Sequence, residues 1–262
     1  MNNFGFCHLT MVPVRANPSH KAEMVSQLLF GETFEITDRH AGWNLIRCSY
    51  DDYEGFIESA QFLPLSHHEW LHLQAASQFY VSNLVDQIEE SANNQKTLIV
   101  AGSSLPGLEN HEFSMGGKKY HFTGPATQGT SENLREKIAG TAENFIGIPY
   151  LWGGRSPFGI DCSGFVQVVF KMNGIKLSRD AALQAQMGDN VHLTEESLPG
   201  DLAFFDNQEG NIVHVGILLK NSTIIHSSGQ VRIDKIDHHG IFNTHLGKYT
   251  HQLRLIRRVL PD

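Results

Sequence analysis

The chain of 262 residues has few of the features that mark exported proteins. It has three cysteines, Cys7, Cys48 and Cys162, and an odd number of them cannot all pair. Its start, Met1-Asn2-Asn3-Phe4-Gly5, has no basic segment and no apolar core, so it predicts no signal peptide. An odd cysteine count without an export signal favours a reducing cytoplasm, where each cysteine is a free thiol.

Long apolar runs and basic clusters are also missing. The longest apolar runs are short, such as Ile212–Leu219, which contains His214, whereas a membrane-spanning helix needs about 20 apolar residues. Lys and Arg number 20 against 28 Asp and Glu, a net charge of −8, and no run of basic residues occurs. We therefore expect neither a membrane nor a nucleic acid as a partner.

The composition that remains is that of a folded protein. Apolar residues make up 40% and charged residues 18%, which excludes a wholly disordered chain. The length predicts one large domain or two to three small ones. We place the domain limits at 1–65, 66–128 and 129–262.

The first domain is predicted to be a small β-barrel. Turn signals at Gly31-Glu32, Ala41-Gly42 and Asp51-Asp52 separate short strand-like runs. These runs are Met24–Phe30, Thr33–Ile36, Trp43–Tyr50 and Tyr53–Ile57. Short strands at this spacing are typical of a barrel.

The second domain begins with a helical pattern over 67–90, which predicts one amphipathic helix or two abutting ones. Its apolar and small residues recur at helical spacing, and Asn93-Asn94 follows them. They are Trp70, Leu73, Ser77, Tyr80, Leu84 and Ile88. From Lys96 the chain is β-like again, which predicts a second small barrel with this helix as an insertion.

The third domain is predicted to be α+β. A helix over 133–146 precedes a glycine-rich loop, a second helix over 162–172 and a run of strands between Leu202 and Leu260. Such an order predicts helices packed on an antiparallel sheet.

Cys162 has the local sequence of a catalytic nucleophile. Asp161 is a good N-cap residue, and Phe165, Val169 and Met172 form an apolar helix face behind it. The thiol then lies in the first helical turn, where free N–H groups and the helix dipole are expected to lower its pKa and to hold an oxyanion. Cys7 and Cys48 lack this context, and we interpret them as small buried residues.

Two histidines on apolar, strand-like segments supply the base that a thiol nucleophile needs. His214 lies in Ile212–Leu219, and His226 lies in Thr223–Ser227, with a polar turn near Lys220 between them. A hairpin centred there places both imidazoles on one side of a sheet, one as base and the other orienting it.

These motifs together resemble the NlpC-type cysteine peptidases, papain-like enzymes that cut bacterial cell-wall peptides. The matching segments lie between about residues 130 and 260. They are Tyr150-x-Trp-Gly-Gly, Asp161-Cys162-Ser163-Gly164-Phe165, Leu198-Pro199-Gly200-Asp201-Leu202, His214-Val-Gly and Ile225-His226-Ser. The resemblance implies Cys162 as nucleophile, His214 as general base and His226 as the polar third member, without metal or organic cofactor. We interpret Pro199-Gly200-Asp201 as a plain turn.

The first domain extends the resemblance. The order of Val14-Arg15, Gly42-Trp43 and Tyr53-Glu54-Gly55-Phe56-Ile57 is similar to that of bacterial SH3-like domains. Together the domains resemble the γ-D-glutamyl-L-diamino-acid endopeptidases of peptidoglycan recycling, in which the SH3-like domain closes one end of the cleft and admits only a free N-terminal L-alanine.

That resemblance implies a set of substrate-binding residues. Glu23, Tyr53 and Asp180 would bind the ammonium group, because a buried ammonium needs carboxylate partners. Others would line the cleft for a small muropeptide, L-Ala-γ-D-Glu-diamino acid: Tyr150, Trp152, Asp161 and Ser163.

Two alternatives from other classes stay open. His68-Glu69-Trp70-Leu71-His72 matches the H-E-x-x-H zinc motif, in which Glu69 would act as base between the ligands His68 and His72. Chance matches are frequent in a chain with 15 histidines, and no third ligand follows at the usual spacing. The other alternative is a cell-wall binding module without activity, which the intact Cys/His pattern disfavours.

Overall fold

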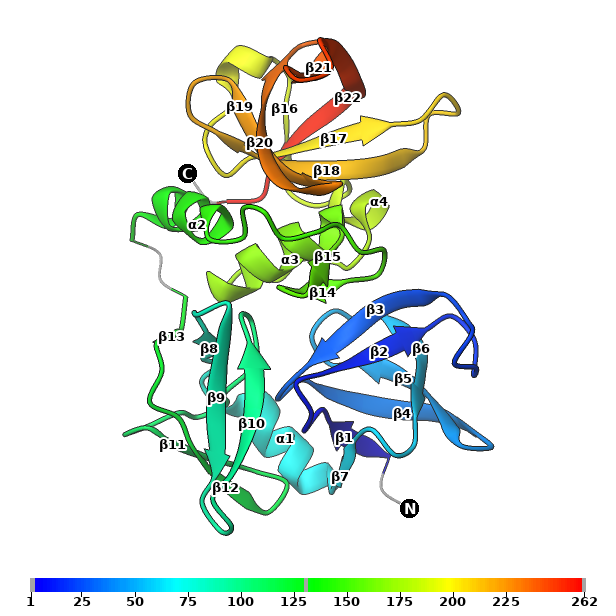
Figure 1. Cartoon of the computed structure of the whole chain (residues 1–262), viewed down its shortest axis with the longest axis vertical. Helices are drawn as coiled ribbons and strands as arrows, with labels where there is room; N and C mark the ends of the chain where they lie inside the picture. Colours follow the sequence, from blue (N-terminus) through cyan, green and yellow to red (C-terminus); the bar gives the residue numbers. More distant parts are fainter. Residues whose placement is uncertain (1–2, 130–131, 261–262) are drawn as a thin grey trace.

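The computed structural model describes residues 3–129 and 132–260, so Met1 and Asn2 of the N-terminal stretch lie outside the described residues. Figure 1 shows two groups of N-terminal strands at one end of the molecule and a C-terminal barrel at the other, with α2 and α3 between them. The helices are α1 (His67–Ala75), α2 (Leu134–Glu143), α3 (Cys162–Met172) and α4 (Ala181–Gln184), with a 3-10 turn η1 (Thr194–Glu196). No helix in the described part of the chain has the length and apolarity that a membrane crossing requires.

The first sheet contains the strands that turn signals predicted in the N-terminal segment. In spatial order they are β3 (Met24–Leu29), β2 (Met11–Arg15), β6 (Glu54–Glu58), β5 (Trp43–Cys48), β4 (Thr33–His40), β1 (Phe4–Phe6) and β7 (Leu63–Leu65). Alternate residues point inward, as at Val12 and Val14 in β2, which are fully buried. This sheet therefore has its own apolar core.

The predicted helix over 67–90 is wrong beyond its first turns. Ala76, after α1, has an extended backbone, and the segment behind it bonds to a turn instead: Leu105 N–H donates to the Phe79 carbonyl and Val81 N–H to the Ser103 carbonyl. Residues at helical spacing, such as Tyr80 and Ile88, are buried as predicted, but they are buried on strands. Short apolar runs fit both the helical and the strand periodicity, and pairing with distant strands decided between the two.

A second, smaller sheet follows α1. Asn93-Asn94, expected to end a helix, instead joins two strands, and Asn94 adopts the positive φ of a tight turn. The sheet consists of β10 (Gln95–Val100), β9 (Val85–Glu90), β12 (Lys118–His121) and β11 (Glu112–Met115), beside the pair β8 (Tyr80–Val81) and β13 (Ala126–Thr127). The division of the chain at residues 65 and 128 stays a prediction.

The antiparallel C-terminal sheet closes on itself. Its strands are β16 (Asp189–Val191), β22 (Lys248–Arg258), β17 (Leu202–Asp206), β18 (Ile212–Leu219), β19 (Thr223–Ser228), β20 (Gln230–Asp237) and β21 (Gly240–Asn243). β22 pairs with both β17 and β21, and a bulge in each pairing bends the ladder, so six strands form a barrel with β16 outside it.

Helix α3 connects this barrel to the rest of the molecule. It begins and ends where the sequence predicted, and every one of its residues is buried. One side of it contacts β18 and β19, and other contacts reach α2, β8 and β14 (Arg155–Ser156), which pairs with β15 (Gly159–Ile160). A helix that is buried on all sides is held firmly in place, and its first residue, Cys162, is therefore held in a fixed position.

Candidate active site

Cys162 is the first residue of α3, and Asp161 caps the helix as expected. The Asp161 carboxylate accepts hydrogen bonds from Gly164 N–H at 2.7 Å and from Gly153 N–H at 2.9 Å. The cap therefore ties the start of α3 to the glycine-rich loop before it. Gly153 has a φ of +74°, and a Cβ there would lie 2.2 Å from the Met24 carbonyl oxygen of the first sheet, so only glycine fits.

The expected low pKa of the Cys162 thiol is wrong. Burial raises the pKa to about 12, and the charge of Asp161 adds to this, while the backbone groups of Val215 and Ser163 and the Arg179 guanidinium lower it. The helix start therefore acts in the predicted direction, but desolvation outweighs it. Cys162 rests as a neutral thiol beside the backbone of the residue that follows His214.

The two predicted histidines meet. His214 on β18 and His226 on β19 are both buried, and His214 Nε2 lies 2.8 Å from His226 Nδ1. The turn between their strands is near Lys220, as expected, but the two residues are diagonal neighbours. Gly216 separates them: a Cβ there would lie 2.9 Å from the Cβ of His226, so the absence of a side chain makes room for the imidazole pair.

Sequence reasoning missed the next member of the chain, Asp234 on β20. His226 Nε2 lies 3.1 Å from Asp234 Oδ2, and Arg232 Nε donates to the same oxygen at 2.8 Å. The strand pairing explains this contact. His226 lies opposite Arg232, and Asp234, two residues further along β20, shares the face of Arg232. The third strand of the β18–β20 meander therefore carries the carboxylate that orients His226.

A third imidazole, which the sequence did not single out, packs on this pair. The His251 ring from β22 stacks on His214 with 4.2 Å between ring centroids. Burial lowers the pKa of His214 well below 6.5, and the charges of His226, His251 and Arg232 would lower it further. Burial also lowers the pKa of His226, against the opposing effect of Asp234. Both imidazoles are neutral at pH 7, so His214 is available to accept a proton.

Tyr150 and Trp152 lie beside this centre. Burial, and the neighbouring Cys162 and Asp161, raise the pKa of Tyr150 to about 12, so its hydroxyl stays protonated. Trp152 is an exposed side chain whose Nε1 donates to Glu23 Oε1 at 2.6 Å. Glu23 belongs to the N-terminal segment, so the first sheet touches the loop that precedes Cys162.

Tyr53 and Asp180 form a second contact of this kind. The Tyr53 hydroxyl is hydrogen bonded to the Asp180 carboxylate, and Asp180 is half-buried at the start of α4. Burial raises the pKa of Asp180, and Arg179 opposes the shift. Each predicted ammonium-binding residue of the first sheet is therefore paired with one predicted site residue of the C-terminal part.

Arg179 was missed although it stands next to Asp180. It is almost completely buried and donates to both oxygens of Asp161, with Nη2 2.5 Å from Oδ2. It also donates to Ser163 Oγ at 2.9 Å and to Ser26 Oγ of β3 at 3.1 Å. Arg179 thus fixes both residues that flank Cys162 and connects them to the first sheet.

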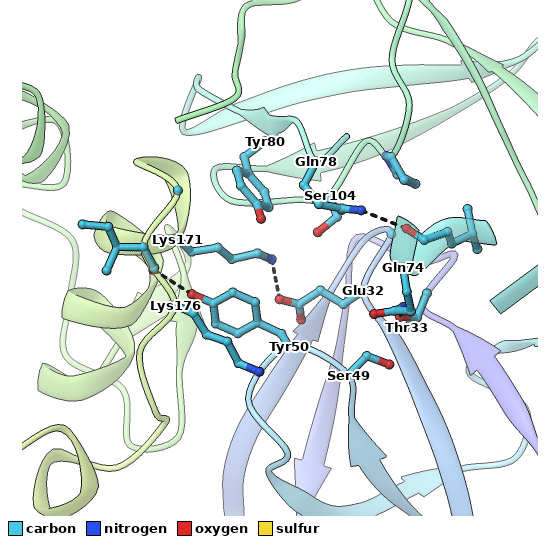
Figure 2. A pocket seen from close by; sticks show the side chains of 15 residues that line it. Glu32, Thr33, Ser49, Tyr50, Gln74, Gln78, Tyr80, Ser104, Lys171 and Lys176 are labelled. Carbon is cyan, nitrogen blue, oxygen red and sulfur yellow. Dashed lines mark hydrogen bonds and ion pairs between the residues drawn. The ribbon is translucent and has the colours of Figure 1, made fainter. Parts of the chain in front are cut away.

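A buried ionic cluster joins the same two parts further from the thiol. Glu32 accepts hydrogen bonds from Arg155 at 2.9 Å through both oxygens and from Lys171 of α3 at 2.6 Å. Figure 2 shows Lys171 reaching Glu32 between Tyr50 and Tyr80, at the edge of a cavity of about 250 Å³ that none of the predicted site residues line. All three charged side chains are at most 5% exposed.

The remaining motifs have structural roles. Glu69 of the H-E-x-x-H motif accepts hydrogen bonds from Ser66 N–H and Oγ and so closes a capping box at the start of α1. No group of three His, Cys, Asp or Glu side chains within residues 3–129 and 132–260 is arranged to hold a metal ion. Cys7 and Cys48 are buried thiols, as expected. Asp201, after the Pro-Gly turn, is fully buried and paired with Arg135 and Arg258.

Comparison with known proteins gives two family matches. The NlpC/P60 family matches residues 147–250, and the bacterial dipeptidyl-peptidase SH3 domain matches residues 14–62. The first match covers Cys162, His214 and His226, and the second covers Glu23 and Tyr53.

Individual relatives match most of the chain. A γ-D-glutamyl-L-lysine dipeptidyl-peptidase of Bacillus subtilis is 32% identical over 77% of this chain and 71% of its own length. Dipeptidyl-peptidase 6 of Lysinibacillus sphaericus is 26% identical over 87% of this chain and 89% of its own. The crystal structure of an NlpC/P60 family protein from Bacillus cereus shares the fold over 98% of this chain and 100% of its own, with a TM-score of 0.83 at 19% identity.

Proposed function

Since the chain belongs to the NlpC/P60 family of cell-wall peptidases and carries a bacterial SH3 domain, we propose that it hydrolyses the γ-D-glutamyl–diamino acid bond of small cell-wall peptides with a free N-terminal L-alanine. The observation that carries this proposal is the placement of Cys162. Its thiol lies at a helix start beside the backbone of Val215, the residue that follows His214 in the hydrogen-bonded chain His214–His226–Asp234, and residues of the SH3 domain contact the loop before it.

The resting protonation states define the first step. Cys162 is a thiol and His214 a neutral imidazole, so His214 removes the thiol proton as the sulfur attacks the γ-glutamyl carbonyl. N–H groups at the start of α3 stabilise the oxyanion. Charge on His214 is favoured by its bond to His226 and, through it, by Asp234.

The second half of the reaction returns the proton. Protonated His214 donates to the leaving amine of the diamino acid, which departs as the thioester forms at Cys162. The imidazole then removes a proton from water, the hydroxide adds to the thioester, and the thiol is restored. The products are L-Ala-D-Glu, whose γ-carboxyl group is now free, and a peptide that begins with the diamino acid.

The SH3 domain would select the free amine. We propose that the ammonium group of L-alanine binds among Glu23, Tyr53 and Asp180, while Tyr150, Trp152, Asp161 and Ser163 line the adjoining cleft. Trp152 bonds to Glu23 and Tyr53 bonds to Asp180, so both carboxylates are held in place by residues of the proposed site. A substrate without the ammonium would leave these carboxylates without a cation.

We place the reaction in the cytoplasm, as part of peptidoglycan recycling. Three free thiols, two of them buried away from the proposed site, suit a reducing compartment. A net charge of −8 also suits a small diffusible substrate better than an anionic polymer.

The test uses two synthetic peptides and mass spectrometry of the products. One is L-Ala-γ-D-Glu-diaminopimelate, and the other is the same peptide with an acetylated amine. We expect cleavage of the free peptide alone, complete loss of cleavage in Cys162→Ala, and a loss of discrimination between the peptides in Asp180→Asn. The exposed carboxylate variant Glu54→Gln in the same SH3 domain serves as the control and should not change the selectivity.

Equal cleavage of both peptides would keep the peptidase and reject the amine site. No cleavage of either peptide would reject the substrate assignment and favour the binding module.

A further inference from the structure

Arg232 is a partly exposed cation at the edge of the imidazole cluster with no role in the reaction described above. It extends from β20, the strand next to β19 in the barrel (Figure 1), on the same face as His226. Its Nε donates to Asp234 and its Nη1 donates to the Ser228 carbonyl at 2.7 Å. Its side chain keeps 27% exposure, so the guanidinium is held in place yet reachable by a ligand.

Hydrogen bonds connect this guanidinium to the loop that carries Tyr150. The Ser228–Gly229 turn that Arg232 holds also accepts a backbone hydrogen bond from Tyr150 at 3.0 Å, through the Gly229 carbonyl. Arg232 therefore connects the turn beside the Tyr150 loop to Asp234, the carboxylate that bonds His226. Its Nη2 donates no hydrogen bond to any residue within 3–129 and 132–260.

The direction of the substrate decides what meets this cation. The SH3 domain approaches through Trp152 and Asp180, so the alanyl-glutamyl half extends toward that side. The leaving amine must be near His214 to be protonated. His226 and Asp234 are buried behind His214, so the group of this face that a leaving half could meet is the partly exposed Arg232. Arg232 is three hydrogen bonds from His214 along that face, through Asp234 and His226.

Resting on the proposed function, we propose that Arg232 binds a carboxylate of the leaving diamino acid and so selects substrates whose leaving half is anionic. A planar guanidinium with two nitrogens already oriented by the protein is suited to carboxylate. The carboxylate has two sources: the α-carboxyl group when the diamino acid ends the peptide, or the side-chain carboxyl group of diaminopimelate.

The experiment compares kcat/KM for three peptides with a free amine. The first is L-Ala-γ-D-Glu-L-Lys with a free carboxyl terminus, the second is its carboxamide, and the third is the diaminopimelate peptide with only its α-carboxyl group amidated. We expect the unmodified protein to prefer the first over the second about tenfold or more, as for other hydrogen bonds to charged groups. If the third is cut like the first, the side-chain carboxylate also serves; if it is cut like the second, only the α-carboxylate does.

Variants of Arg232 distinguish between its two possible roles, which are binding of the substrate carboxylate and positioning of Asp234. Arg232→Gln should bring the first and second peptides to equal kcat/KM, chiefly through a higher KM for the first, and Arg232→Lys should keep part of the preference. Arg254→Gln, which removes another carboxylate-paired arginine from the same barrel, should change nothing. If Arg232 only positions Asp234, Arg232→Gln will lower kcat equally for both peptides and preserve their ratio.

That preserved ratio, or equal cleavage of acid and amide by the unmodified protein, would overturn the inference while leaving the proposed function intact. Absence of cleavage of all three peptides would overturn both.

Discussion

Two clusters of titratable side chains are equally buried in this protein and rest in opposite charge states. In the ionic cluster, Arg155 and Lys171 hold the pKa of Glu32 at about 2 although burial alone would raise it. In the imidazole cluster, neither His214 nor Cys162 forms an ion pair with another described residue, and burial keeps both neutral although the Arg179 guanidinium lowers the pKa of Cys162. Burial therefore neutralises a group unless a partner of opposite charge repays the desolvation cost.

The difference matches what each cluster has to do. The ionic cluster joins the turn before β4 of the SH3 domain to α3 and β14, and a fixed set of charges holds that interface in one geometry. The proposed catalytic cluster must exchange protons during the reaction, which requires groups that are not locked in the charged form. The same buried, low-dielectric environment thus strengthens fixed ion pairs at the interface and keeps the proton-exchanging groups of the reaction centre neutral.

The largest expected effect comes from breaking the ionic cluster. Glu32→Gln leaves Arg155 and Lys171 buried without a counter-charge, and we expect the free energy of unfolding to fall by about 3–5 kcal/mol. Chemical denaturation followed by fluorescence measures this. The matched control is Glu54→Gln, because Glu54 pairs with Arg47 on the solvent-exposed surface and should contribute little. An equal fall in the free energy of unfolding for the two variants would show that the buried cations do not need the charge of Glu32.

The second prediction separates the clusters by pH. The folded pKa of His251 is lowered from 6.5 to about 4, and those of His214 and His226 are lowered too, so the unfolded chain binds these protons first and stability falls as the pH drops below about 6.5. Glu32 is lowered from 4.5 to about 2, so its contribution is complete above pH 4.5 and is lost between about 4.5 and 2.

Two variants show which residues cause the loss of stability in each of the two pH ranges. Unfolding free energies measured from pH 7 to pH 2 should lose the lower window in Glu32→Gln and part of the upper window in His251→Phe, which retains a ring to stack on His214. A single window that neither variant alters would contradict the assignment.

The third prediction concerns the carboxylate at the end of the imidazole chain. Asp234→Asn replaces the anion that favours charge on His226, and we expect kcat to fall about tenfold or more, as for loss of a hydrogen bond to a charged group. Steady-state cleavage of the free muropeptide measures it. Asp237→Asn is the control on the same strand, since Asp237 is partly exposed and accepts hydrogen bonds from the exposed Tyr249 and from the His239 N–H. An unchanged kcat in Asp234→Asn would remove Asp234 from the mechanism.

Local patterns in the sequence predicted the elements around the nucleophile well. An N-cap residue followed by an apolar face predicted α3 with its bounds, and turn residues predicted the strands β3 to β6. The helix over 67–90 failed because its apolar residues fit a strand equally well, and only pairing with Gln95–Val100 decides. Periodicity is a local property, whereas the partner strand is not.

The same limit applies to the site. Cys162, His214 and His226 stood in recognisable contexts, but Arg179 and Glu32 are single charges whose partners lie more than a hundred residues away or on another element. Their importance arises from burial, which the sequence does not display at a lone charged residue. The sign of the Cys162 pKa shift was misjudged for the same reason: the helix start is visible in the sequence, and the depth at which it is buried is not.

The smallest expected effect is in the reactivity of the free protein near neutral pH. Because Cys162 rests as a thiol with its pKa raised to about 12, alkylation by iodoacetamide at pH 7 should be no faster than that of an ordinary exposed thiol, and it should rise about tenfold per pH unit at least up to pH 9. Cys162→Ala corrects for any slow labelling of the buried Cys7 and Cys48. A rate that is already high and constant between pH 6 and pH 8 would mean that the thiol and His214 form an ion pair before substrate binds. The imidazole cluster would then be charged at rest, like the cluster around Glu32, and the contrast between the two regions would disappear.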